Sequence, residues 1–276
     1  MLYLVATPIG NLGDITHRAL EILKTCDLLL CEDTRHSQIL LHHYGIHRPA
    51  WSFHLFNESA REERVIQELQ AGKQVALISD AGTPGIADPG ERLIQRCIAE
   101  GITVVPIPGP CAAIAALIGS GLKTEPFQFV GFLPRQEGSL QKKLLEILRY
   151  PGTTICYESP RRLHKVLHQI QRQDPLRQLV VARELTKKFE EYERGTAEQL
   201  LQKWGEEIKG EVILLISQDS RSQNEEWALL SPEVHVTWLM ETYGISSREA
   251  IKMAAELRGV PKREIYQAVI HPSQEA

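Results

Sequence analysis

No apolar run in this 276-residue sequence approaches the roughly 18–20 residues that a membrane-spanning helix requires. The N-terminal segment MLYLVATPIG has only a short apolar run with no basic region before it, so we expect no signal peptide. The five cysteines are scattered, odd in number and set among apolar residues, and none belongs to a CxxC pair. This usage predicts free, buried thiols in a reducing cytoplasm and no metal site.

The sequence also has no excess of positive charge. The 31 lysines and arginines are outnumbered by 35 aspartates and glutamates, which makes the formal net charge -4 with neutral histidine. A protein held on nucleic acid by bulk charge is basic, so any RNA binding here must depend on a local basic surface. The composition, 43% hydrophobic and 24% charged, is that of an ordinary globular chain, and the length predicts about two domains.

Three familiar motifs are also absent. No G-x-G-x-x-G follows a predicted strand, which weakens a dinucleotide-binding interpretation, and no G-x-x-x-x-G-K-[ST] occurs, which weakens a P-loop interpretation. There is no G-x-S-x-G nucleophile elbow either.

What is present is a regular alternation of strands and amphipathic helices. In residues 1–121 the predicted strands are 2–6, 28–31, 74–79 and 102–108, and predicted helices follow Thr16, span 61–71 and begin at Pro89. In residues 122–218 the predicted strands are 127–132, 153–158, 178–184 and 211–217, with helices at 138–149, from Pro160 and at 196–204. Such alternation is typical of right-handed βαβ units, so the first domain should have a parallel sheet and the second a mixed one.

The end of the chain differs in pattern. Residues 219–231 are polar and predict a linker, and residues 232–276 predict three short helices separated by glycine and proline. These helices are either a helix-turn-helix-like module or a small cap on the second domain. The fold class is therefore α/β, with two α/β domains and a small C-terminal helical module.

Three predicted strands of the first domain end in segments of small or turn-forming residues: TPIGN (7–11), SDAGTPG (79–85) and PGPCAA (108–113). Ligands of open α/β sheets bind outside the carboxyl ends of the strands. The third segment opens an alanine-rich helix, whose first backbone N–H groups have no partner within the helix. A ligand held by backbone and small side chains suits a nucleoside without phosphates, such as S-adenosylmethionine. Tight turns that bind nothing are the alternative.

Eight ordered motifs resemble a known family: ATPIGNLGDIT, CEDTRHS, SDAGTPGIADPG, PIPGPCAAIAAL, GFLPR, YESPRRL, ARELTKKFE and GEVILLI. They are similar to the tetrapyrrole-methylase superfamily and, within it, to the ribosomal RNA small subunit methyltransferase I family. The resemblance runs from residue 2 to the end of the chain. It implies S-adenosylmethionine-dependent 2′-O-methylation of a cytidine in the decoding centre of 16S rRNA, by a cytoplasmic homodimer with the cofactor in a cleft between two α/β domains.

Two positions depart from the family pattern. Arg161, in YESPRRL, stands where the family often has histidine. The segment FHLFNES is more apolar than the usual version, although Asn57 and Glu58 match.

The expected cofactor contacts come from the three loops and from the first loop of the second domain. They are Pro8, Asp80, Gly82, Thr83, Pro84, Cys111, Ala112, Ala113 and Tyr157. Asp80 is suited to accept hydrogen bonds from ribose hydroxyls or an ammonium group, and its alternative role is to cap its own loop.

Methyl transfer to a ribose hydroxyl depends largely on positioning, helped by a base or by a cation that stabilises the developing alkoxide. The candidate catalytic residues are Asp33, Glu158, Glu184 and Lys187, acting as a carboxylate or as a lysine of lowered pKa. For Glu184 the alternative is a salt bridge with Arg183.

The expected RNA phosphate contacts are Arg35, Arg135, Arg161, Arg162 and Lys188, together with Lys187. A solvated charged face is the alternative for these residues, and His42 and His43 are expected at the surface of a helix. Two other functions remain open at this point. One is methylation of a small precorrin-type tetrapyrrole, and the other is a non-catalytic RNA-binding assembly factor that uses the C-terminal helices.

Overall fold

The computed structural model describes residues 1–204, 208–218 and 230–270. The chain divides into two compact units, Met1–Gln218 and Asp219–Ala276. Of the predicted linker at 219–231, residues 219–229 lie outside the described ranges. No helix among the described residues is both long and apolar enough to cross a bilayer.

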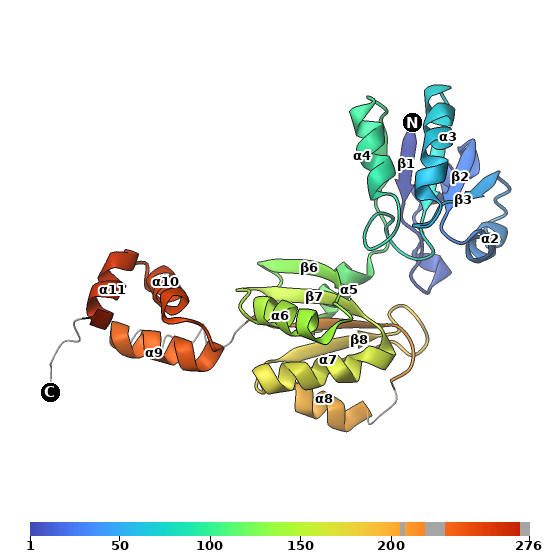
Figure 1. Ribbon diagram of the computed structural model, residues 1–276. Helices are drawn as coiled ribbons and strands as arrows, with labels where there is room; N and C mark the ends of the chain where they lie inside the picture. The colour runs from blue at the N-terminus through green and yellow to red at the C-terminus, as the bar shows by residue number, and fades with distance from the viewer. Residues whose placement is uncertain (205–207, 219–229, 271–276) are drawn as a thin grey trace. The chain divides into compact units, whose positions relative to one another are not determined.

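The first sheet of the Met1–Gln218 unit is parallel throughout, as the alternating pattern predicted (Figure 1). Its strand order is β3-β2-β4-β1-β5. The strands are β1 (Leu2–Val5), β2 (Leu28–Cys31), β3 (Ala50–Ser52), β4 (Val75–Ile78) and β5 (Val104–Ile107). The edge strand β3 was not predicted from the sequence, because it has only three residues and no buried apolar run.

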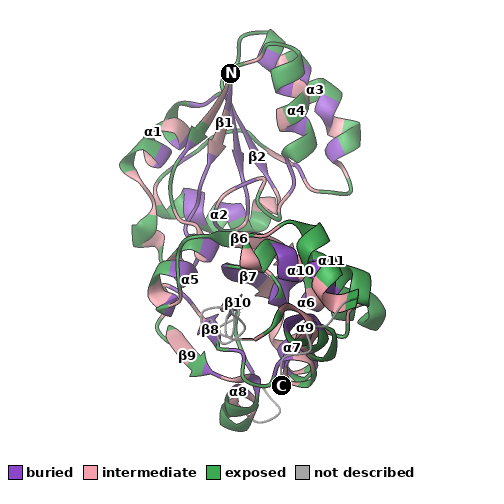
Figure 2. Cartoon of the chain, turned by 90° about the vertical axis from the view of Figure 1, so that its left-hand side faces the viewer, coloured by how far each residue is buried: buried purple, intermediate pink, exposed green. Residues whose placement is uncertain are grey.

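Helices cover both faces of this sheet (Figure 2). They are η1 (Leu12–Asp14), α1 (His17–Thr25), α2 (Thr34–His43), α3 (Glu58–Gln70) and α4 (Glu91–Ala99). Apolar residues of α3 and α4 pack on one face, and those of α1 and α2 pack on the other. The sheet is thereby buried on both sides, which is why its strands read as continuous apolar runs.

Two helix starts show how local sequence sets these boundaries. Thr16 caps α1 as predicted, since its side chain accepts a hydrogen bond from the Ala19 amide at 3.1 Å. The helix expected to begin at Pro89 begins at Glu91 instead. Gly90 has a φ of 124°, outside the helical region, so the preceding proline cannot belong to the helix.

The second sheet is mixed, again as predicted, with the order β6-β7-β10-β8-β9. Its strands are β6 (Phe127–Phe132), β7 (Thr153–Glu158), β8 (Leu179–Arg183), β9 (Glu191–Gly195) and β10 (Val212–Ile216). Helices α6 (Glu137–Leu148), α7 (Pro160–Gln173) and α8 (Ala197–Trp204) pack on one face over a large apolar core. The charged edge strand β9 was not predicted, because its sequence EYERG has no apolar periodicity.

Helix α5 (Ala112–Ser120) joins the two sheets. It follows β5 of the first sheet, yet its apolar side packs on the other face of the second sheet. Tyr192 and Arg194 of β9 fasten it there, since Tyr192 donates to the Ala115 carbonyl at 3.0 Å and Arg194 donates to the Ser120 carbonyl at 2.8 Å. A division of the first 218 residues into two domains at residue 121 stays a prediction.

The Asp219–Ala276 unit shows, within residues 230–270, the three helices that the sequence predicted. They are α9 (Pro232–Tyr243), α10 (Ser247–Arg258) and α11 (Lys262–Ile270), packed around an apolar core of their own. Ser246 and Glu249 form a capping box at the start of α10. His235 lies inside this unit and accepts a hydrogen bond from Arg258, and burial lowers its pKa to about 4. The buried imidazole is therefore neutral at physiological pH.

Candidate functional site

The three glycine- and proline-rich loops meet at the carboxyl edge of the first sheet, as the strand pattern predicted. Thr7 and Gly82 exchange backbone hydrogen bonds of 2.8 and 3.0 Å, which joins the first loop to the second. The Thr83 hydroxyl donates to the Pro110 carbonyl at 3.1 Å, which joins the second loop to the third. The loops therefore form one connected wall.

Gly82 is required by the shape of this wall. Its φ is 82°, which side chains rarely adopt, and an added Cβ would lie 3.3 Å from a methyl carbon of Ile9. Gly82 is buried and does not itself line the cavity beside the loops. Its contribution is to bring Thr83 and Ile9 to the cavity surface.

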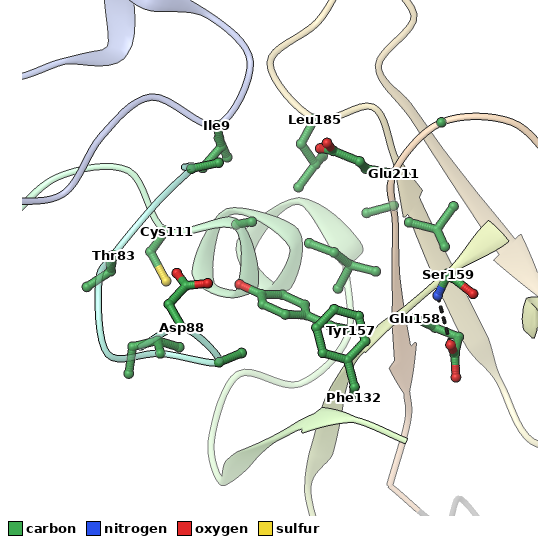
Figure 3. A pocket seen from close by; sticks show the side chains of 18 of the residues that line it. Ile9, Thr83, Asp88, Cys111, Phe132, Tyr157, Glu158, Ser159, Leu185 and Glu211 are labelled. Atoms are coloured by element: carbon green, nitrogen blue, oxygen red, sulfur yellow. Dashed lines mark hydrogen bonds between the residues drawn. The ribbon is translucent and has the colours of Figure 1, made fainter. Parts of the chain in front are cut away.

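A cavity of about 420 Å³ lies between these loops and the second sheet (Figure 3). Its volume is typical of small-molecule sites. Five residues proposed from the sequence line it: Thr83, Cys111, Ala112, Tyr157 and Glu158. The remaining cofactor candidates, Pro8, Asp80, Gly82, Pro84 and Ala113, belong to the same loops but lie outside the lining.

Helix α5 begins at the cavity. Cys111 precedes its first turn, and no described side chain caps the helix there. The free N–H groups at a helix N-terminus carry a partial positive charge and favour an anionic group. With Cys111 and Ala112 both in the lining, this end of the cavity suits a carboxylate.

Asp88 is a lining residue that the sequence analysis missed. Burial, reinforced by the nearby charge of Glu32, raises its pKa to about 6. Figure 3 shows its carboxylate beside the hydroxyl end of Tyr157. The sequence signal for Asp88 is the segment ADPG (87–90), which continues the glycine- and proline-rich loop beyond Pro84.

Tyr157 stands in the cavity wall at the end of β7. Its ring makes edge contacts with Phe129, at 4.8 Å between centroids, and with Phe132, at 5.7 Å. Burial raises the pKa of its hydroxyl to about 12. The residue is therefore neutral at physiological pH and presents an aromatic surface.

Glu158 follows Tyr157 and is 4% exposed. Burial raises its pKa. A hydrogen bond of 2.8 Å from the Ser159 amide and the charge of Arg162 both lower the pKa, but burial is the larger effect. The Arg162 guanidinium lies 3.2 Å from the carboxylate and also donates to the carbonyls of Leu133 and Pro134. Arg162, a candidate for RNA contact, thus fixes the loop after β6.

Glu184 and Lys187 form an ion pair beside Leu185 and Glu211, two residues of the cavity lining. Glu184 accepts from the Glu211 amide at 2.8 Å and from the Lys187 ammonium at 3.1 Å, and Lys187 also lies 3.0 Å from the Glu211 carboxylate. Glu184 and Thr186 have φ values of 51° and 65°, so this loop is strained to hold Lys187 in place. An added Cβ on Gly10 would lie 2.6 Å from Cγ of Lys187, which shows how closely the lysine packs on the first loop.

The contacts of this pair bear on two alternatives that the sequence left open, a lysine of lowered pKa and a Glu184–Arg183 salt bridge. Desolvation is the largest influence on Lys187 and lowers its pKa, but the hydrogen bonds to Glu184 and Glu211 together outweigh it and leave the pKa raised. A lysine of lowered pKa is therefore not present here. Arg183, the partner of Glu184 in the second alternative, instead pairs with Glu191 at 2.8 Å.

The backbone hydrogen bond from Glu211 is the main cause that lowers the pKa of Glu184. Glu184 is therefore a carboxylate that holds Lys187 and the segment before β10 together. Glu211 itself belongs to the cavity lining.

Asp33 lies outside the cavity and caps α2. It accepts from the Arg35 backbone at 2.9 Å and from the Arg35 guanidinium at 2.7 Å, and these hydrogen bonds lower its pKa to about 2. Asp80 accepts from the Asp33 amide at 3.0 Å, so it ties its loop to the loop after β2 instead of capping an amide of its own loop. These contacts give Asp33, Arg35 and Asp80 structural functions.

The other cationic candidates are spread over the surface. Arg35 borders a hollow along α2, and Arg161 borders another with His164 and His168 on α7. Lys188 lies 5.6 Å from the ring of Phe189, and Arg135 is exposed and close enough to Glu158 to lower its pKa. Arg135 therefore acts on a residue of the cavity lining.

The remaining lining residues missed from the sequence come mostly from the second sheet and its loops: Phe132, Ser159, Pro160, Ala182, Leu185, Gly210, Glu211, Val212 and Ile213. Ile9, Ala81, Ile86 and Ala87 of the first-sheet loops complete the set. Apolar residues in a strand are predicted to lie in the hydrophobic core, because the sequence does not show which of them face a cavity. Among the described residues, no three histidine, cysteine, aspartate or glutamate side chains are grouped to hold a metal ion.

Comparison with known proteins agrees with this architecture. The sequence profile of the Tetrapyrrole (Corrin/Porphyrin) Methylases matches residues 1–201. Among solved structures, uroporphyrin-III C-methyl transferase from Thermus thermophilus, determined with S-adenyl homocysteine, has a TM-score of 0.56 at 18% identity, covering 80% of this chain and 98% of its own. Diphthine synthase has a TM-score of 0.61 at 15% identity, and the match covers 79% of this chain and 89% of diphthine synthase. The fold and its cavity thus define a methyltransferase of the tetrapyrrole methylase class.

Relatives of higher sequence identity define the family within this class of methyltransferases. Ribosomal RNA small subunit methyltransferase I of Halalkalibacterium halodurans is 46% identical over 96% of this chain and 93% of its own length. The protein of the same name from Bacillus subtilis is 42% identical over 97% and 93%. The chain belongs to the ribosomal RNA small subunit methyltransferase I family.

Proposed function

We propose that this protein transfers the methyl group of S-adenosylmethionine to the ribose 2′-oxygen of a cytidine in the decoding centre of 16S rRNA. The observation that carries the proposal is the cavity at the joined loops, in a chain 46% identical to a protein named for small-subunit rRNA methylation. The substrate is then the ribosomal small subunit, which places the enzyme in the cytoplasm. A homodimer is part of the same proposal.

The lining fits S-adenosylmethionine in three respects. Tyr157, Val212 and Ile213 offer an apolar surface suited to adenine. The uncapped start of α5 suits the methionine carboxylate, and Asp88 is an anion suited to the ammonium or sulfonium group. The loop residues Pro8, Asp80, Gly82, Pro84 and Ala113 act from behind this lining, by holding its shape.

The bound cofactor supplies an electrophilic methyl group, and this chain's residues position and polarise the ribose hydroxyl. Lys187, kept charged by Glu184 and Glu211, stabilises negative charge developing on the 2′-oxygen. Glu158, in the lining and with a raised pKa, is placed to accept the hydroxyl proton. Arg135 is exposed, and its charge acts on Glu158 in the lining, so it is suited to bind an RNA phosphate beside the cavity.

The proposal is tested by the substrate to which label is transferred. Purified protein with radiolabelled S-adenosylmethionine is offered small ribosomal subunits that lack the modification, and separately a precorrin-type tetrapyrrole. We expect label in the RNA fraction only. Label in the tetrapyrrole alone would replace the proposal with small-molecule methylation, which the uroporphyrin transferase fold makes the natural second candidate.

A further inference from the structure

Phe132 is an exposed aromatic residue in the wall of the cavity. Its side chain is 60% exposed, although it lines the same cavity as the half-buried Tyr157 (Figure 3). Other phenylalanines of the chain are also exposed, but Phe132 is exposed in the wall of an apolar cavity of the kind that binds small molecules. The ring therefore offers a surface for a ligand at the mouth of the cavity.

The backbone of β6 is built to aim this ring. Phe129 pairs with Ile155 and Phe132 pairs with Tyr157, so β6 has one more residue than β7 over this interval. The extra residue is a bulge, and Gly131 in it has a φ of 65°. In a regular strand, side chains three residues apart point to opposite faces of the sheet. Without the bulge, Phe129 and Phe132 would therefore lie on opposite faces.

The bulge changes which face each side chain occupies. Val130 and Leu133 pack into the core under α6 and α7, whereas Phe129 packs on the α5 side of the sheet. Phe132 joins Phe129 on that side through its contact with Tyr157. Without the bulge, Phe132 would be turned toward the core, so its place at the cavity is a specific feature of β6.

The neighbourhood of Phe132 suits a nucleotide. Arg135, exposed and three residues further along, provides a positive charge for a phosphate, and this charge acts on Glu158 in the lining of the same cavity. A cation beside an open aromatic ring is the arrangement by which proteins hold unpaired nucleotides, with the base stacked on the ring. The interior apolar surface at Val212 and Ile213 leaves the adenine of the cofactor a place deeper in the cavity.

We propose that Phe132 is the stacking platform for the base of the target nucleotide, which enters unpaired while its ribose faces the cavity. This inference rests on the proposed function. It adds a substrate-binding residue and a requirement that the reacting nucleotide be unstacked from its neighbours.

The test compares substitutions at Phe132 by their effect on the RNA substrate and on the cofactor. Phe132→Ala should raise the KM for unmodified small subunits about tenfold or more, the loss that removal of one stacked base produces. The dissociation constant of S-adenosylmethionine, measured by calorimetry without RNA, should stay within about twofold. Phe132→Trp should retain the wild-type KM, and Phe132→Leu, which keeps apolar bulk without a ring, should behave like Phe132→Ala.

Phe127→Ala is the matched control, because Phe127 is a partly exposed phenylalanine at the opposite end of the same strand. It should leave KM unchanged. Equal KM values for the leucine and tryptophan variants, or an equal KM increase in the control, would overturn the stacking role. A parallel loss of cofactor affinity in Phe132→Ala would assign the ring to adenine instead. If the wild-type protein labels no RNA, the proposed function fails together with this inference. If the wild-type protein labels RNA and Phe132→Ala has the wild-type KM, this inference alone fails.

Discussion

At the scale of single residues, the surroundings of Asp88, in the cavity lining, and of Glu184, beside the lining residues Leu185 and Glu211, produce two kinds of carboxylate. Asp88 is partly buried, and burial together with the nearby charge of Glu32 raises its pKa to about 6. Glu184 is hydrogen-bonded by the Glu211 amide and Lys187, so its pKa falls. The first group is poised for a cationic ligand, and the second holds a cation of the protein.

Asp88 should make stability depend on pH. Its folded-state pKa of about 6 lies above the usual value of an unfolded aspartate, so its favourable contribution is complete below about pH 4 and is lost as pH rises through 6. Asp88→Asn removes the buried charge, and should raise the free energy of unfolding by about 1–2 kcal/mol at pH 7.5 and by much less at pH 4. Thermal unfolding of the ligand-free protein at both values measures the difference.

The same substitution should weaken binding of S-adenosylmethionine at pH 7.5, because the carboxylate opposite the cation is lost. Asp14→Asn, an exposed aspartate in η1, is the control and should change neither quantity. An equal stability gain at both pH values would show that ionisation of Asp88 is not its cause.

Lys187 should act as a permanent cation. Lys187→Gln should slow single-turnover methyl transfer about 10²–10³-fold, as removal of one electrostatic stabiliser does, with little change in cofactor affinity. Lys165→Gln is a matched control, since Lys165 is also ion-paired, with Glu137 at 3.4 Å, but on the surface of α7. Because the pKa of Lys187 is raised, its ionisation should not appear in the wild-type rate profile between pH 6 and 9. An unchanged rate in Lys187→Gln would remove it from the catalytic group.

At the scale of elements, the bulge in β6 links backbone conformation to substrate binding. Gly131 and Gly45 have similar φ values, 65° and 62°, and an added Cβ meets nothing within 4 Å at either site. Alanine at each should therefore lower the free energy of unfolding by about 1–2 kcal/mol through backbone strain alone.

Only Gly131→Ala should also raise the KM for the small subunit, because only Gly131 belongs to the bulge that aims Phe132. Gly45 follows α2, which ends at His43, and lies far along the chain from β6. Unfolding curves and steady-state kinetics on both variants separate the two effects. A matching KM increase in Gly45→Ala would show that general destabilisation explains the result.

Sequence patterns were sufficient for the elements whose burial is periodic or continuous. The buried strands of both sheets and the helix after Thr16 follow directly from such patterns, and so does the meeting of the three loops. The edge strands β3 and β9 lack an apolar signal and depend on pairing with neighbours far along the chain.

The candidate site was predictable where loops follow strands of the first sheet. Thr83 and Cys111 were found in this way. Phe132 was not, because strand alternation assigns its face wrongly unless the bulge is known. Asp33 was proposed for chemistry because it follows a strand, but a carboxylate in that position can equally cap the next helix, and here it does.

At the scale of the whole molecule, the two compact units should separate functions. Within the described ranges, the residues that line the cavity all lie in Met1–Gln218, and the three C-terminal helices have their own core. A protein ending at Gln218 should therefore fold and bind S-adenosylmethionine with an affinity within about twofold of the full chain, measured by calorimetry. Loss of cofactor binding in a folded truncated protein would show that the helical unit completes the site.

The central claim is methylation of one ribose in the small-subunit RNA, and mapping the transferred methyl group tests it most directly. Small subunits lacking the modification are incubated with the protein and labelled S-adenosylmethionine, and the label is located at nucleotide resolution. The account predicts one labelled cytidine in the decoding centre, modified at the ribose 2′-oxygen. Label on a base, or on a nucleotide outside the decoding centre, would contradict it.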